Sequence, residues 1–133
     1  MANRNFRSQF SYSYAGQPVV IRAKLTFGSS GAVTLASGTG MGITSITKGS
    51  DAGEYAIVFS STYASLMGIS ATFSSGTSAP AAPIVNIETN TISTAGTPTI
   101  TLQCRNISAA VANPASGEIM YLEITLNNSS TGY

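Results

Sequence analysis

The sequence predicts an all-β protein, folded as a single antiparallel β-sandwich or jelly-roll-like barrel of about 8–10 short strands with at most one short helical turn. Two observations carry this prediction. Apolar and polar residues alternate along most of the 133 residues, and clusters of Gly, Pro, Asn and Ser separate the alternating runs. β-Branched and aromatic residues dominate those runs, and no long segment repeats its apolar residues with a helical period.

Strand-like alternation occurs in nine segments, in chain order residues 6–14, 19–27, 32–35, 43–47, 54–60, 69–73, 84–88, 99–105 and 118–126. The first of them carries four aromatic residues of one parity, from Phe6 to Tyr14, with polar residues of the other parity between them. The second alternates most strictly, from Val19 to Phe27. Both patterns are typical of a strand with one buried face.

Glycine marks the connections between these strands. Residues 28–31 are a predicted turn, and residues 48–53 are the strongest hairpin signal because their glycines permit positive φ between two β-rich runs. The Gly-rich residues 38–42 superficially resemble a phosphate-binding loop. Such a loop needs a helix N-terminus behind it, whereas here a strand follows, so we interpret these residues as a bent or bulged connection.

Two further segments carry specific expectations. Tyr63, Leu66 and Met67 have the spacing of one helical face, which predicts a single helical turn within residues 61–68. The last segment, residues 118–126, is apolar on both parities. A strand that is apolar on both faces is expected at the centre of a sheet.

The composition is unusual for a soluble domain. Hydrophobic residues make up 43% of the chain but charged residues only 8%, against roughly 25% in an average domain. Small uncharged residues fill the difference, with 20 Ser, 16 Thr, 17 Ala and 13 Gly. So weakly charged a surface is poorly protected against association, which favours a subunit that neighbours cover in an assembly.

The residue inventory excludes most catalytic chemistry. The chain has no histidine and one cysteine, so it holds no Ser-His-Asp or Cys-His pair, no histidine metal site and no internal disulfide. Asp51 and Glu54 are close carboxylates, but they flank a hairpin and are expected to be solvated. Cys104 shares its parity with Ile100 and Leu102, which predicts a small buried core residue. We therefore expect no enzyme, no cofactor and no metal site.

Charge and hydropathy also limit the expected partners. A net charge of +1 gives no electrostatic basis for direct nucleic-acid binding. No apolar stretch approaches the roughly 18–20 residues of a membrane helix, so we expect no membrane partner. No apolar signal-peptide core follows residues 1–7, and we expect the chain to be made and folded in a cytoplasm.

We divide the chain into an N-terminal arm (residues 1–7), a β-sandwich domain (residues 8–126) and a polar C-terminal tail (residues 127–133). The arm is either a frayed end or a contact segment, and the tail ends in an aromatic residue that is either an anchor in a neighbour's pocket or an exposed residue. The candidate partner-binding residues are Arg4, Phe6, Arg7 and Tyr133.

Four parts of the chain carry a resemblance to a known group: residues 1–6; residues 23–28 with 31–34; residues 42–46 with 53–55 and 63–68; and residues 113–120 with 127–129. With these segments the chain resembles small β-rich virion structural proteins of tailed bacteriophages, of the capsid decoration or cement type. The resemblance implies a protein on the virion capsid surface that binds the major capsid protein, reinforces the shell and forms a homotrimer. It implies no catalytic residues.

Two alternatives stay open. The chain could be another virion component, either a shell-forming coat subunit or a tail subunit. A coat subunit that packages nucleic acid should carry more than the six basic residues present here, which disfavours that alternative. The chain could also be a carbohydrate-binding or host-binding β-sandwich, because sugar sites use exposed aromatic residues, which Tyr12, Tyr14, Tyr121 and Tyr133 could provide.

Overall fold

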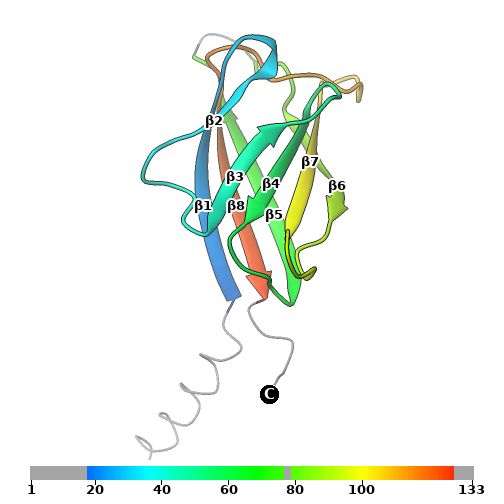
Figure 1. The fold of residues 1–133 in the computed structure, drawn as a ribbon. Coiled ribbons are helices and arrows are strands. Elements are labelled where there is room, and N and C mark those ends of the chain that lie inside the picture. The colour runs from blue at the N-terminus through cyan, green and yellow to red at the C-terminus, as the bar shows by residue number, and fades with distance from the viewer. Residues whose placement is uncertain (1–17, 77–78, 128–133) are drawn as a thin grey trace, which may run out of the picture.

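The computed structural model describes residues 18–76 and 79–127, and these residues form an all-β fold of two four-stranded antiparallel sheets, which confirms the predicted β-sandwich (Figure 1). One turn of 3-10 helix, Ser29–Gly31, lies where the sequence predicts a turn. The strands are β1 (Pro18–Phe27), β2 (Val33–Leu35), β3 (Ile43–Lys48), β4 (Glu54–Phe59), β5 (Ser65–Ser74), β6 (Ile84–Asn90), β7 (Thr99–Arg105) and β8 (Ile119–Asn127).

The strand order explains how the two sheets are linked. The first sheet has the order β2-β1-β8-β5 and the second has the order β3-β4-β7-β6. β1 pairs with β8 from Pro18 opposite Asn127 to Thr26 opposite Ile119. β8 thus lies between β1 and β5, which confirms its predicted central position. The chain changes sheet after β2, β4, β5 and β7, so consecutive elements bind the two sheets together.

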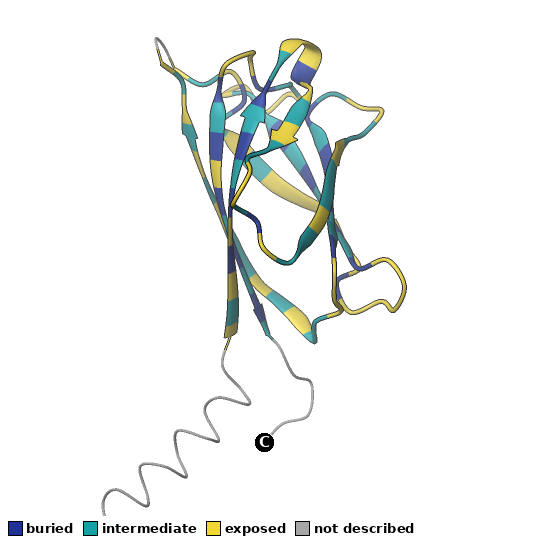
Figure 2. Cartoon of the chain, turned by 60° about the vertical axis from the view of Figure 1, so that its left-hand side comes forward, coloured by how far each residue is buried: buried dark blue, intermediate teal, exposed yellow. Residues whose placement is uncertain are grey.

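The core lies between the sheets and is built mainly from alternate residues of the four inner strands, with Ala82 and Ile92 added from the connections on either side of β6 (Figure 2). β1 and β8 contribute eight of the buried side chains, because period-two alternation turns every second residue of each strand inward. The buried residues of the core are Ile21, Ala23, Leu25, Phe27, Tyr55, Ile57, Phe59, Ala82, Ile92, Ile100, Leu102, Cys104, Met120, Leu122, Ile124 and Leu126. Cys104 is fully buried, as predicted.

Aromatic contacts join the two sheets near the end where β1 finishes. The rings of Phe27 on β1 and Tyr55 on β4 meet edge to face with their centroids 5.4 Å apart. Phe27 also stacks on Phe73 of β5 at 6.3 Å. The Tyr55 hydroxyl donates a hydrogen bond to the carbonyl of Gly31 at 2.8 Å, which gives this buried polar group a partner and holds the 3-10 turn.

The predicted helical turn within residues 61–68 is wrong. Leu66 and Met67 belong to β5, and the pairing of β5 with β8 shifts by one residue between Leu66 and Gly68. Met67 is the extra residue of this bulge and is 62% exposed. A bulge breaks period-two alternation, and the altered spacing imitates one turn of a helix.

The predicted hairpin at residues 48–53 joins β3 to β4 and depends on a glycine at its end. Gly53 has a φ of 74°, a conformation that residues with a Cβ rarely adopt. A Cβ there would lie 2.5 Å from the carbonyl oxygens of Cys104 and Ala112. The Gly53 carbonyl in turn accepts a hydrogen bond from the Cys104 N–H at 2.8 Å. The hairpin therefore packs backbone to backbone against the end of β7.

We predict that Gly53→Ala lowers the free energy of unfolding by about 2 kcal/mol or more, because the methyl group adds both backbone strain and a clash with two carbonyl oxygens. Gly68→Ala is the matched control, since a Cβ at Gly68 meets no atom within 4 Å and its φ is not positive. That control should change the free energy by about 0.5 kcal/mol or less. Urea denaturation of both variants measures the difference, and equal stabilities would contradict the proposed role of Gly53.

Candidate functional site

The partner-binding residues predicted from the sequence, Arg4, Phe6, Arg7 and Tyr133, lie outside the described residues, as do the arm of residues 1–7, the expected strand of residues 6–14 and nearly all of the tail. The described residues instead form two surfaces that could bind a partner. One lies at an end of the second sheet, and the other is a hollow on the outer face of the first sheet.

The first surface is an exposed apolar patch. It consists of Ile84, Arg105, Ile107 and Val111, and we call it the Ile107 patch. Ile84 lies opposite Arg105 in the β6–β7 pair, and Arg105 forms an isolated bridge with Val111, so Arg105 lies between these two apolar residues. Ile107 lies in the loop between Arg105 and Val111 and is 85% exposed. Ile84 and Val111 are also classed among the exposed large hydrophobic residues.

Hydrogen bonds hold the loop that carries Ile107 in one conformation. The Asn106 side-chain oxygen accepts hydrogen bonds from the N–H groups of Ser108 at 2.9 Å and Ala110 at 3.1 Å. The Asn106 N–H donates to the Ala110 carbonyl at 2.9 Å, which closes the loop. Side-chain bonds of this kind are characteristic of tight Asx turns. The exposed isoleucine is therefore presented by a pre-organised turn.

Arg105 supports the same loop from the strand side. Its Nη1 donates a hydrogen bond to the Ala109 carbonyl at 2.7 Å, and its Nη2 donates to the side-chain oxygen of Gln103. Ala109 has a φ of 65°, in the left-handed region that costs a residue with a Cβ roughly 1–2 kcal/mol. The hydrogen bond from Arg105 to the Ala109 carbonyl helps to hold that backbone conformation, so the Arg105 guanidinium stabilises the loop.

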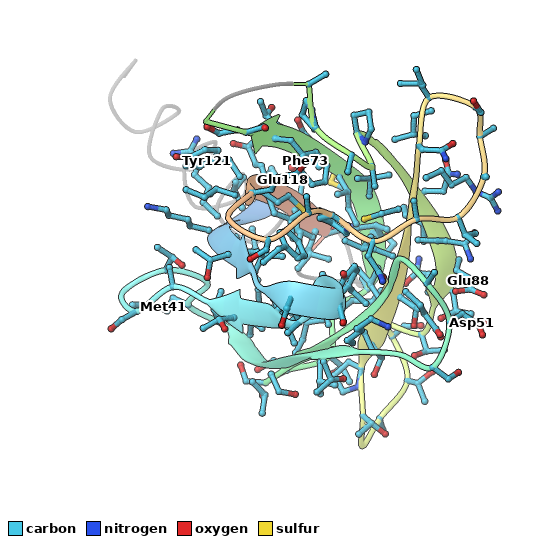
Figure 3. The ribbon with its side chains drawn as sticks, turned by 90° about the horizontal axis from the view of Figure 1, so that it is seen from above. Met41, Asp51, Phe73, Glu88, Glu118 and Tyr121 are labelled. Carbon is cyan, nitrogen blue, oxygen red and sulfur yellow. The ribbon has the colours of Figure 1, made fainter. Side chains whose placement is uncertain are left out.

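The second surface, the Tyr121 hollow, has a volume of about 420 Å³. It lies over the outer face of β1, β8 and β5 and is lined by Arg22, Ala23, Lys24, Thr39, Ser70, Thr72, Tyr121, Leu122 and Glu123. Tyr121 is 48% exposed and lies opposite Lys24 on one neighbouring strand and Thr72 on the other. Figure 3 labels Tyr121 on the outside of the sandwich. The hollow therefore contains an aromatic ring that is surrounded by hydroxyl and charged groups.

An ion pair and a folded-back connection form the walls of this hollow. Arg22 Nε lies 2.9 Å from Glu123 Oε2. The Arg22 side chain is largely exposed and that of Glu123 is about half exposed, so the pair contributes at most about 1 kcal/mol to stability. On one side, the Lys24 N–H donates to Thr39 Oγ1 at 3.2 Å, and the Gly40 N–H donates to the Arg22 carbonyl at 2.8 Å. Residues 38–42 thus form the predicted bent connection.

Glu118 is a buried carboxylate for which the sequence gives no signal beyond its place at the start of a strand. It is 4% exposed, and its Oε1 accepts a hydrogen bond from the Ala81 N–H at 2.8 Å. Its Oε2 is buried and has no hydrogen-bond partner among the described residues. Glu118 therefore ties the start of β8 to the connection between β5 and β6, close to Phe73 in the view of Figure 3.

Acidic residues are otherwise dispersed. The carboxylate of Glu54 accepts a hydrogen bond from the Asp51 N–H at 3.2 Å, and Asp51 is exposed, as predicted for a solvated hairpin. Within residues 18–76 and 79–127, no group of three or more His, Cys, Asp or Glu residues is placed to hold a metal ion. No helix in this part of the chain is long and apolar enough to cross a bilayer.

Burial perturbs two acidic groups in the core. Burial raises the pKa of the Cys104 thiol to about 12, and the nearby Glu118 carboxylate adds to the shift. Burial also raises the pKa of the Tyr55 hydroxyl, with a smaller effect from Cys104. Both groups are neutral when protonated, so the folded state disfavours their ionisation. The Cys104 thiol is correspondingly a poor nucleophile.

We predict that stability falls in alkaline solution. The Cys104 thiol ionises from about pH 9 in the unfolded chain but only near pH 12 in the folded one, so its contribution is complete below pH 9 and decreases as the pH rises through this window. Each such group lowers the free energy of unfolding by about 1.4 kcal/mol per pH unit. Urea denaturation between pH 8 and pH 11 should show this slope, and Cys104→Ala should reduce it. An unchanged slope in that variant would contradict the assignment.

No protein-family model, no curated protein and no solved structure matches this chain. The two surfaces are therefore interpreted from their own residues.

Proposed function

We propose that this chain is a structural virion protein that binds the assembled capsid of a tailed bacteriophage and reinforces it, as a decoration or cement protein. The Ile107 patch is the observation that carries this proposal. A large apolar side chain that is 85% exposed on a hydrogen-bonded loop is suited to insertion into a pocket of a protein partner. Because the loop is already ordered, binding costs little conformational entropy.

The partner in this proposal is the major capsid protein in its assembled lattice. Burial of one isoleucine stabilises a contact by about 1.5–3 kcal/mol, which is modest for a single site. A homotrimer would present three such patches to a symmetric lattice. Because the three patches would be linked, they would bind the lattice with a higher overall affinity than one patch alone. A protein that binds only the assembled shell stabilises it by mass action. Binding through the apolar side chains of the patch does not require a charged surface.

The terminal residues have a place in the same proposal. Arg4, Phe6 and Arg7 on the arm and Tyr133 on the tail are proposed to contact neighbouring subunits or the capsid. Deletion of residues 1–7 should then weaken attachment to the particle without loss of the fold. The amount of truncated chain that rebinds to stripped virions, compared with the full-length chain, distinguishes a binding arm from a frayed end.

We predict that Ile107→Ser lowers the affinity for stripped virions at least tenfold, because the lost apolar burial of about 1.5–3 kcal/mol corresponds to a factor of ten or more. Met41→Ser is the matched control. Met41 is 93% exposed on the connection between β2 and β3 and projects at the margin of the view in Figure 3. Occupancy and heat resistance of particles reloaded with each variant provide the measurement. Equal reloading by Ile107→Ser and the unmodified chain would show that the patch is not the interface.

A second candidate function, carbohydrate or host-surface binding, is favoured by the Tyr121 hollow. A half-exposed aromatic ring can stack on the apolar face of a sugar, while Arg22, Glu123 and the hydroxyls of Ser70 and Thr72 can hydrogen-bond its hydroxyl groups. The ion pair between Arg22 and Glu123 also holds their polar atoms beside the ring before a sugar binds.

We predict that Tyr121→Ala abolishes any binding in a glycan array or in saturation-transfer NMR, whereas Tyr121→Phe retains most of it because the ring remains. The unfolding transition of both variants should stay close to that of the parent, since Tyr121 lies on the surface. If the unmodified chain binds no glycan, or if Tyr121→Ala still binds, the sugar-binding alternative is wrong.

A further inference from the structure

The sandwich is closed along one side and open along the other. β2 lies against β3 where the two sheets meet on the closed side. On the open side, the edge strands β5 and β6 border a groove of about 260 Å³. Its lining residues are uncharged and all but one are apolar in type, although more of the exposed lining surface is polar than apolar; they are Ile69, Ala71, Pro83, Val85, Asn86 and Ile87.

The β5 side of this groove has the features of a sheet that continues. Among the described residues, β5 pairs with β8 only, so its other edge carries backbone N–H and C=O groups without a strand partner. Ile69, Ala71 and Phe73 face the core and lie opposite fully buried residues of β8, yet they themselves are only half-buried. One more strand beside β5 would complete their burial.

The chain contains a segment with the required pattern immediately before β1. Residues 8–14 place Phe10, Tyr12 and Tyr14 on one parity and Gln9, Ser11 and Ser13 on the other. We propose that this segment of the same chain adds to β5 as an antiparallel strand, with Phe10 and Tyr12 in the groove. This is β-augmentation within one molecule, in which main-chain hydrogen bonds give affinity and alternate side chains fill the groove.

Direction and reach are consistent with an addition from the same chain. β1 and β5 both run antiparallel to β8, and Pro18 and Ser65 both lie opposite Asn127, so β1 and β5 start at the same end. A segment that precedes β1 and reverses before it therefore runs antiparallel to β5. The step from Pro18 to a strand beyond β5 spans three strand spacings, about 14 Å across, and about 10 Å along β5 to the level of Ile69.

These two components give a separation of about 17 Å, and the six Cα steps from Tyr12 to Pro18 can span about 20 Å. The straight line between these two points crosses the start of β5 and the end of β8, so the linker of residues 13–17 has to pass over the outer face of these strands nearly fully extended. Its Gly16 permits the reversal. In this register Tyr12 lies beside Ile69 and Phe10 beside Ala71, where the small side chain leaves room for a ring. Ser11 then lies beside Ser70 on the outer face, and residues 1–7 stay free for contacts with a partner.

A pair of cysteine substitutions in the full-length chain tests this placement. Ser11→Cys with Ser70→Cys should form a disulfide within one chain under mild oxidation, at least fivefold more efficiently than the control pair Ser11→Cys with Thr34→Cys. Thr34 is exposed on β2, the opposite edge of the same sheet. The native Cys104 is fully buried and does not compete. Non-reducing electrophoresis and peptide mass spectrometry distinguish bonds within a chain from bonds between chains.

Equal yields for the two pairs would overturn the proposal. A disulfide formed mainly between chains would also overturn it, because the strand would then come from a second copy. Neither result depends on capsid binding, so failure here leaves the proposed function untouched.

Hydrogen exchange provides a second, independent measurement on full-length protein. Amides of β5 that point away from β8 should exchange at least tenfold faster in Phe10→Ser/Tyr12→Ser than in the parent. The matched control Ser11→Ala/Ser13→Ala, which changes only residues of the outward parity, should leave these rates within twofold. Fast exchange of these β5 amides in the parent itself would exclude a strand beside β5.

Discussion

The pairing of β1 with β8 is the interaction on which the rest of the fold depends. These strands lie about a hundred residues apart in the chain, yet they form nine opposed residue pairs at the centre of the first sheet. Their inward side chains provide half of the buried apolar core. Among the described residues, β5 pairs as a strand only with β8, and β2 only with β1. Loss of this one pairing would divide the sheet into two separate strand pairs, β2 with β1 and β8 with β5.

Polar contacts at one end of the sandwich connect the core to the Ile107 patch. Asn113 accepts a hydrogen bond from the Gly53 N–H at 2.8 Å, and the Ala112 N–H donates to the Cys104 carbonyl at 3.2 Å. The hairpin between β3 and β4 and the connection after β7 are thereby held together. Because Val111 follows directly from this framework, the exposed patch rests on backbone that the core has already ordered. Gly53 allows this close approach of backbones because it has no Cβ.

Period-two alternation was sufficient to predict the strands of the core, the central position of β8 and the burial of Cys104. It was not sufficient at β5, because the bulge at Met67 inserts one residue and changes the parity of the apolar residues that follow. The Ile107 patch could not be predicted for a different reason. Ile107 lies in a loop, where period-two alternation gives no information on exposure, and the stiffness of its loop depends on bonds from Asn106 and Arg105 that sequence spacing does not reveal.

The separation of β1 and β8 along the chain also has a consequence for biosynthesis. During translation, β1 emerges about a hundred residues before β8, the strand with which it pairs. Until β8 emerges, the apolar face of β1 and the edge that pairs with β8 stay accessible to other nascent chains. Non-local strand pairing of this kind also slows folding, because a long loop must close before the contacts that stabilise it can form. Emergence of β8 from the ribosome is therefore the event that allows the first sheet to form.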